Sequence, residues 1–166
     1  MANERTDRSM ETPTTSERDG RKLSDVMTRN PECATEKDTL QSVARMMRDC
    51  DCGAIPVVGD DRKLRGMITD RDIVIRCIAE GKNPMDATVG NIMTREIYSV
   101  RENESLDEVF RVMSERQVRR VPILGNNDEV IGIIAQADLA IDSPSDEKVG
   151  RTVEHISEPD RPRAGR

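Results

Sequence analysis

The chain has 166 residues, enough for one domain or two very small ones. Aromatic residues make up only 1% of it, so the core must be aliphatic and we expect no aromatic platform for stacking bases. The net charge of −6 argues against a nucleic-acid partner, because that class of protein needs a positive field around phosphates. No apolar run approaches the ~20 residues that span a bilayer, and the N-terminus lacks the apolar core of a secretory signal. We therefore expect a soluble, cytoplasmic protein with no membrane partner.

The first half of the chain predicts a short lead-in, a helix, two strands and a second helix. Residues 1–21 are polar and without an apolar period, so we expect a disordered N-terminal tail. After the lead-in at 26–28, a helix opens at Leu40, capped by Thr39 or Asp38. Short apolar strands follow over 54–58 and 64–68, and a second helix begins near Thr69. The apolar faces expected for the two helices comprise Leu40, Val43, Ala44, Met47 and Cys50, and then Ile73, Val74, Cys77 and Ile78.

The same pattern recurs 66 residues later without a gap. Segment 38–47 falls on 104–113, and 64–73 falls on 130–139. The chain is therefore two copies of one unit, and two such units packed together can bury a shared core. We expect a first domain over 22–82, a linker over 83–88, a second domain over 89–142 and a polar C-terminal tail over 143–166. Within that tail, residues 148–159 are patterned for a helical turn or two.

Four cysteines, Cys33, Cys50, Cys52 and Cys77, all lie in the first half. Nothing indicates secretion, so an even count does not by itself predict disulfides. Zinc is disfavoured because C-x-C is not the usual ligand spacing and the one histidine, His155, lies in the tail. We favour buried small hydrophobic residues over a redox role, and we expect no metal site.

The stretch GMITDRD at 66–72 has two interpretations. Locally, Thr69 is the N-cap of a helix and Asp72 lies in its first turn, near the positive end of the helix dipole. The same geometry suits a nucleotide, because a carboxylate there can accept hydrogen bonds from two ribose hydroxyls while Arg71 reaches a phosphate. Residues 54–56 would offer an apolar edge to the base. The residues alone leave both interpretations open.

The second copy reads GIIAQAD at 132–138, so it keeps Asp138 but has Ala135 in place of threonine. A hydrogen bond to a charged group is worth roughly 1.5–3 kcal/mol. We therefore expect the second site to bind about ten- to a thousandfold more weakly, or to be empty. The alternative is a helix start that dispenses with its cap, at a cost of about 1 kcal/mol.

The tandem pattern resembles a cystathionine-β-synthase (CBS) domain pair, or Bateman module. The resemblance rests on the Met-Thr at the start of each copy, on the apolar-Pro-apolar triplets at 55–57 and 121–123, and on the Gly-to-Asp motif at 66–72. It covers roughly residues 23 to 142. Stretches 59–75 and 117–123 are similar to stand-alone bacterial CBS-pair proteins, including the hypoxic response protein type.

The resemblance implies an α/β (α+β) fold of two β-α-β-β-α units packed through their sheets, usually as a homodimer. It implies no required cofactor but a possible ligand, namely AMP, ADP, ATP or S-adenosylmethionine. By the resemblance, the ribose would be held by Thr69 and Asp72, and by Asp138 in the second site. The phosphate would face Arg71, Arg119 and Arg120. The base would lie against Ala34, Thr35, Ala54, Ile55 and Pro56 in the first site, and against Val100, Arg120, Val121 and Pro122 in the second.

The sequence holds no set of nucleophile, base and orienting group, so we expect no enzyme. The leading interpretation is a regulatory module that binds an adenosine-containing nucleotide in the cleft between its domains and signals to a dimer interface or an unknown protein partner. One alternative is a ligand-free stress-response interaction protein, to which Arg101, Arg119 and Arg120 in the weaker copy lend weight. Another is a redox sensor that uses Cys50 and Cys52, or Cys33 and Cys77.

Overall fold

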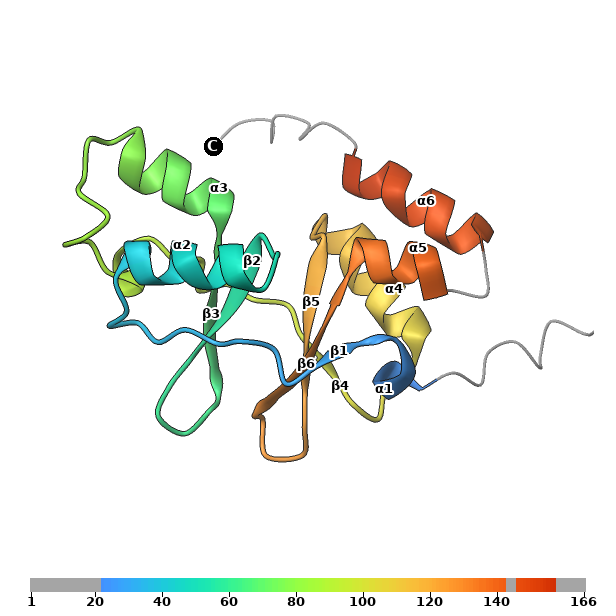
Figure 1. Ribbon diagram of the computed structural model, residues 1–166. Coiled ribbons are helices and arrows are strands. Elements are labelled where there is room, and N and C mark those ends of the chain that lie inside the picture. Colours follow the sequence, from blue (N-terminus) through green and yellow to red (C-terminus); the bar gives the residue numbers. More distant parts are fainter. Residues whose placement is uncertain (1–21, 143–145, 158–166) are drawn as a thin grey trace, which may run out of the picture.

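The structure is a computed structural model that describes residues 22–142 and 146–157. Two similar units of helices and strands lie next to each other (Figure 1). The mixed fold predicted from the sequence is therefore confirmed. The N-terminal tail predicted over 1–21 lies outside the described residues.

The first unit follows the predicted order of elements closely. Its bounds are α1 Leu23–Val26, β1 Thr28–Arg29, α2 Leu40–Asp49, β2 Ala54–Val58, β3 Leu64–Thr69, α3 Asp70–Ile73 and a π-helical continuation, η2 Val74–Ile78. The N-cap of α2 is Thr39, whose hydroxyl accepts a hydrogen bond from the Ser42 amide at 3.2 Å. The other predicted cap, Asp38, accepts from the Thr35 amide instead.

The second unit repeats this plan and adds a helix. It consists of η3 Val89–Asn91, β4 Val100–Arg101, α4 Leu106–Arg116, β5 Arg120–Leu124, β6 Val130–Ala135, α5 Gln136–Asp142 and α6 Asp146–Ser157. The sequence predicted at most a turn or two in the C-terminal region, whereas α6 is 12 residues long. Val149 and Ile156 pack against the core of the second unit. This apolar contact stabilises a helix that the polar sequence alone does not predict at this length.

Each sheet takes an edge from the segment that precedes the other unit. In one sheet β1 pairs with β6, β6 with β5, and β5 with β4. In the other, β2 pairs with β3, and Thr94 forms an antiparallel bridge to Met67 just as Thr28 pairs with Ile133. Both lead-in segments therefore cross over (Figure 1), and Thr94 is paired with β3 of the first unit.

The buried side chains form two clusters, one for each unit, and not the single shared core that the repeat predicted. One cluster is centred on β5, β6 and α4, the other on α2, β2 and β3. Because of the crossover, Met27 belongs to the cluster of the second unit and Met93 to the cluster of the first. No helix in the described ranges is long and apolar enough to cross a membrane.

The apolar faces predicted for the helices of the first unit are only partly buried. In α2, Leu40, Val43 and Met47 are buried, but Ala44 and Cys50 are exposed, since Cys50 already caps the helix end. In the second helix Ile73 and Cys77 are buried, whereas Val74 and Ile78 are 57% and 52% exposed. The π-helical turn changes the spacing, as the Ala79 amide bonds to the Val74 carbonyl five residues back. We call Val74, Ile75 and Ile78 the open helix face.

Candidate functional site

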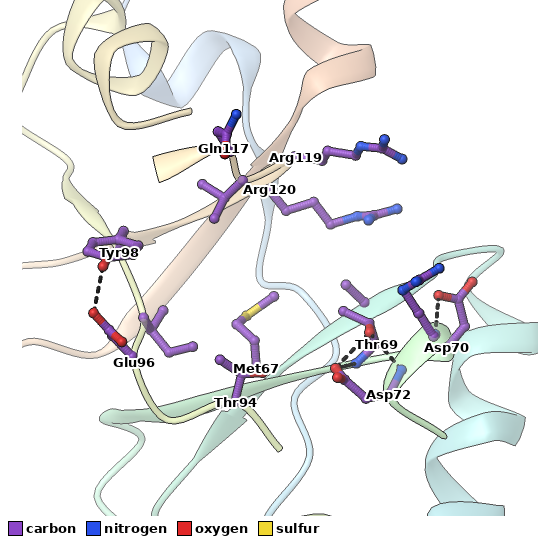
Figure 2. Close-up of a pocket in the computed structure, with 14 residues that line it drawn as sticks. Met67, Thr69, Asp70, Asp72, Thr94, Glu96, Tyr98, Gln117, Arg119 and Arg120 are labelled. Atoms are coloured by element: carbon purple, nitrogen blue, oxygen red, sulfur yellow. Dashed lines mark hydrogen bonds between the residues drawn. The ribbon is translucent and has the colours of Figure 1, made fainter. Parts of the chain in front are cut away.

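A cavity of about 460 Å³ lies where the two units meet. This volume falls in the range of roughly 300–1,000 Å³ that is typical of small-molecule sites. Figure 2 shows the side chains that line it. They come from the first unit, from the segment that crosses back to it, and from the turn that leads from α4 into β5: Ala54, Met67, Thr69–Asp72, Thr94, Glu96–Tyr98 and Gln117–Arg120.

Thr69 and Asp72 form a closed capping box at the edge of the cavity. Oδ2 of Asp72 accepts hydrogen bonds from the Thr69 hydroxyl at 2.7 Å and from the Thr69 amide at 3.0 Å. The Asp72 amide donates in turn to the Thr69 hydroxyl at 3.1 Å. Thr69 therefore holds the carboxylate in one orientation, and the local and the ligand-binding interpretations of the motif describe the same geometry.

The Asp72 carboxylate has acceptor capacity beyond this box. Its side chain is 14% exposed, and Oδ1 lies 3.5 Å from Nε of Arg76. An ionised carboxylate offers about four lone-pair positions, of which Thr69 uses two. Arg76 faces Oδ1, and the positions that neither residue occupies can accept from hydroxyl donors.

Charges of both signs face the cavity. Three carboxylates (Asp70, Asp72, Glu96) and three guanidinium groups (Arg71, Arg119, Arg120) belong to its lining. Figure 2 shows Arg119 and Arg120 extending from one wall, with Thr69, Asp70 and Asp72 on the other. The balance favours neither a highly anionic nor a highly cationic ligand, but it provides donors for a phosphate or a carboxylate.

One wall of the cavity is aromatic and aliphatic, which the sequence did not predict. Tyr98 lines it together with Ile97 and Val118, and the guanidinium carbon of Arg116 lies 4.5 Å from the centre of the Tyr98 ring. The Tyr98 hydroxyl donates to Glu96 at 2.7 Å, and this hydrogen bond raises the pKa of the tyrosine. Tyr98 thus brings an aromatic ring to the cavity, where the composition predicted aliphatic walls. No sequence signal marked Tyr98, because its counterpart in the first copy is Glu32.

The structure brings together some of the predicted site residues and separates others. Ala54, Thr69, Arg71, Asp72, Arg119 and Arg120 line the cavity. The remaining predicted residues do not line it: Ala34, Thr35, Ile55, Pro56, Val100, Val121, Pro122 and Asp138. Most of them are buried strand residues, for example Ile55 and Val121, whose side chains fill the cores of the two units.

The lining of this cavity thus differs from the predicted grouping by copy. The sequence placed Thr69 and Asp72 with base-contacting residues of their own unit, at 34–35 and 54–56. Of these only Ala54 lines the cavity, and the wall beside it comes from 94–98 and 117–120. The cause is the crossover after η3, which pairs Thr94 with Met67 of β3 and brings residues 96–98 to the cavity.

The second unit keeps half of the capping box. The Ala135 amide donates to Oδ2 of Asp138 at 2.7 Å, as Thr69 does to Asp72. Ala135 has no hydroxyl, so the second hydrogen bond to the carboxylate and the bond from the Asp138 amide are lost. The Asp138 carboxylate is thus held by fewer bonds than that of Asp72.

Cysteine positions differ from the favoured interpretation. Cys77 is buried and Cys33 is half-buried, but Cys50 and Cys52 form a disulfide at the end of α2. Burial raises the pKa of the Cys33 thiol. The interpretation as buried small hydrophobic residues is wrong for Cys50 and Cys52, because one lies past the end of the helix and is exposed and the other is only half-buried.

A protein-family model described as "CBS domain" matches residues 23–78 and 89–141. The chain is 45% identical over 116 residues to hypoxic response protein 1 of Mycobacterium tuberculosis, a match that covers 70% of this chain and 80% of that one. A crystal structure of Hypoxic Response Protein I with two coordinated zinc ions aligns with a TM-score of 0.68 and 42% identity, over 75% of this chain and 100% of that chain.

A second solved structure contains adenosine ligands. The CBS domain pair of protein MJ0100, in complex with 5′-methylthioadenosine and S-adenosyl-L-methionine, aligns with a TM-score of 0.66 and 26% identity. The alignment covers 73% of this chain and 98% of that one.

The zinc of the first structure has no evident counterpart here. Within residues 22–142 and 146–157, no three or more His, Cys, Asp or Glu side chains are grouped so that they could hold a metal ion. Zinc needs about four ligands for a structural site. The described residues therefore do not fit it.

Proposed function

The chain belongs to the CBS-domain family, and we propose that it is a regulatory module that binds an adenosine-containing nucleotide in the cavity between its units. The observation that carries the proposal is the carboxylate of Asp72, fixed by Thr69 at the edge of a cavity that faces Arg119 and Arg120. The MJ0100 structure, with its two adenosine ligands, supports the ligand class.

The lining suggests how each part of such a ligand would bind. The ribose hydroxyls would donate to Asp72, whose orientation is already fixed, so little ordering entropy would be lost on binding. Ile97, Tyr98 and Val118 would contact the base. Arg119 and Arg120 would receive the phosphate or carboxylate group. Because charges are balanced in the cavity, AMP and S-adenosylmethionine are both reasonable candidates.

Isothermal titration calorimetry with AMP, ADP, ATP and S-adenosylmethionine tests this proposal. We expect saturable heat with at least one of them and loss of most of that affinity in Asp72→Ala. Asp138→Ala is the matched control, since Asp138 does not line the cavity. Equal loss in both variants, or no heat and no thermal shift with any ligand at millimolar concentration, would overturn the proposal. The second outcome would favour the ligand-free interaction protein.

We propose that binding is transmitted through the packing of the two units. A ligand that contacts β3 on one side and the start of β5 on the other favours the arrangement in which both walls are at binding distance. It can shift the equilibrium only by its difference in affinity for the two arrangements. The change would then reach a partner protein or a dimer interface. The name of the M. tuberculosis relative supports a place in a stress response. A cytoplasmic location stays a prediction, which cell fractionation would test.

The open helix face supports the homodimer as a further part of the proposal. Val74, Ile75 and Ile78 are 57%, 46% and 52% exposed, and such apolar clusters on a surface are typical of interaction sites. In the second unit, by contrast, α6 packs against α4 and α5. Analytical ultracentrifugation should show a dimer that Ile75→Glu and Ile78→Glu convert to a monomer. A dimer unchanged by both would exclude this face as the interface.

A further inference from the structure

The cysteines of the turn after α2 form a second site. Cys50 is the C-cap of α2 and is exposed, and Cys52 is half-buried just before β2. Their Cα atoms are 5.3 Å apart, within the range of about 4.4–6.8 Å over which a disulfide closes, and the two residues form one. We propose that this pair is a thiol–disulfide exchange site that sets the ligand affinity of the adjacent cavity.

The fold does not need this disulfide to build the turn. Between the cysteines, Asp51 is left-handed with a φ of 49°, and the Cys52 amide bonds to the Met47 carbonyl at 2.9 Å. The second unit builds the same turn without sulfur. There Gln117 has a φ of 51°, and the Val118 amide bonds to the Met113 carbonyl at 3.2 Å.

The disulfide also contributes little to the stability of the fold. It closes a loop of only three residues, and stabilisation by a disulfide falls as the loop shortens. A contribution to global stability therefore does not account for it. Its exposure on the Cys50 side does allow an external thiol to attack the disulfide.

The turn leads directly into the cavity wall. The residue after Cys52 is Gly53, whose carbonyl accepts a hydrogen bond from the Asp70 amide at 3.1 Å. A Cβ built on Gly53 would lie 3.0 Å from Oδ2 of Asp70 and 3.4 Å from Nη2 of Arg120, and both of these side chains line the cavity. A displacement of the turn would therefore act on Asp70, which is bonded to Gly53, and on the neighbouring Arg120 side chain.

Oxidation proceeds by two exchange steps with a low-molecular-weight disulfide. The Cys50 thiolate attacks one sulfur of the external disulfide, and one external thiol leaves. The Cys52 thiolate then attacks the mixed disulfide at Cys50 and releases the second external thiol. The two electrons and two protons of the protein dithiol thus pass to the external disulfide, and an excess of external thiol reverses both steps.

The closed disulfide constrains Asp51 to its left-handed conformation and keeps the Gly53 carbonyl bonded to the Asp70 amide. In the oxidised form this part of the cavity wall is therefore ordered before the ligand binds. In the reduced protein only hydrogen bonds hold this turn. Because ordering a loop on binding reduces affinity, we expect the reduced protein to bind the nucleotide about three- to tenfold more weakly. This step rests on the proposed function, whereas the exchange site itself does not.

The full chain is equilibrated in glutathione buffers of increasing oxidised fraction. Alkylation followed by mass spectrometry should show Cys50 and Cys52 becoming protected together while Cys33 and Cys77 stay alkylatable after denaturation. Hydrogen exchange at the Asp70 amide should be slower in the oxidised form, with or without ligand. Calorimetry with AMP and S-adenosylmethionine then gives the ratio of affinities.

Cys52→Val copies Val118 of the second unit and removes the switch with little change of packing. In this variant the affinity for the nucleotide and the hydrogen exchange of the Asp70 amide should no longer depend on the redox buffer. In the Cys33→Ser variant both should depend on it as in the natural sequence. Independent alkylation of Cys50 and Cys52 in oxidising buffer would overturn the exchange site. Joint protection without a change in Asp70 exchange would overturn the coupling. If no nucleotide binds in either form, the proposed function fails. The alkylation and hydrogen-exchange results then still show whether the cysteine pair is a redox switch.

Discussion

Thr69→Ala gives the first unit the residue that the second unit has at the corresponding position, Ala135. The variant loses the hydrogen bond of 2.7 Å from the threonine hydroxyl to Asp72 and the bond of 3.1 Å that the hydroxyl accepts from the Asp72 amide. It keeps the bond from the backbone amide, as Ala135 does with Asp138. Loss of an N-cap costs about 1 kcal/mol of the free energy of unfolding.

The effect on binding is larger if Thr69 orients a working carboxylate. A hydrogen bond to a charged group is worth roughly 1.5–3 kcal/mol, and Thr69 is only half-buried, so we expect the lower part of that range. The dissociation constant for the nucleotide should then rise about tenfold. Calorimetry with the ligand that binds the natural sequence gives the constant, and urea unfolding gives the stability.

Thr39→Ala is the matched control, because Thr39 caps α2 in the same way but does not line the cavity. It should cost a similar amount of stability, about 1 kcal/mol, and leave the dissociation constant unchanged. If Thr69→Ala lowers stability equally and leaves affinity unchanged as well, then Thr69 is a helix cap alone. The cap and the ligand site would then be unrelated.

Three further predictions concern other positions. Ala135→Thr should complete the box around Asp138 and raise the free energy of unfolding by about 0.5–1 kcal/mol, measured by urea unfolding. Gly66→Ala would bring a Cβ to 2.8 Å from the Thr94 carbonyl oxygen and should cost about 1–3 kcal/mol, measured by thermal unfolding. Burial raises the pKa of Cys33, so its thiolate fraction at neutral pH is small, and its alkylation by iodoacetamide should accelerate only at a higher pH than that of an exposed thiol. Equal rates of alkylation of Cys33 in the folded and in the denatured chain would contradict this.

Local patterns in the sequence predicted most of the secondary structure correctly. The strand over 54–58 and the start of α2 follow from apolar period and capping, which depend on neighbouring residues alone. The role of Thr69 as a cap follows in the same way. The repeat also predicted that the second unit would copy the first, including the weakened box at Ala135.

The exposure of Val74 and the three turns of α6 were not predictable in this way. A π-helical turn and a helix that is stabilised by packing against α4 depend on contacts between distant residues. The disulfide between Cys50 and Cys52 likewise depends on where α2 ends, because a helix one residue longer would alter the turn that brings the two Cα atoms together.

By itself the sequence determined the two-unit architecture, most elements within each unit and the capping pair, Thr69 and Asp72. The tertiary structure decided which residues face that pair. Thr94 bridges to Met67, so the chain crosses between units and brings Tyr98 to the cavity while Ile55 is buried in a core. Local patterns cannot specify this, because a strand's apolar alternation shows that it pairs but does not identify its partner.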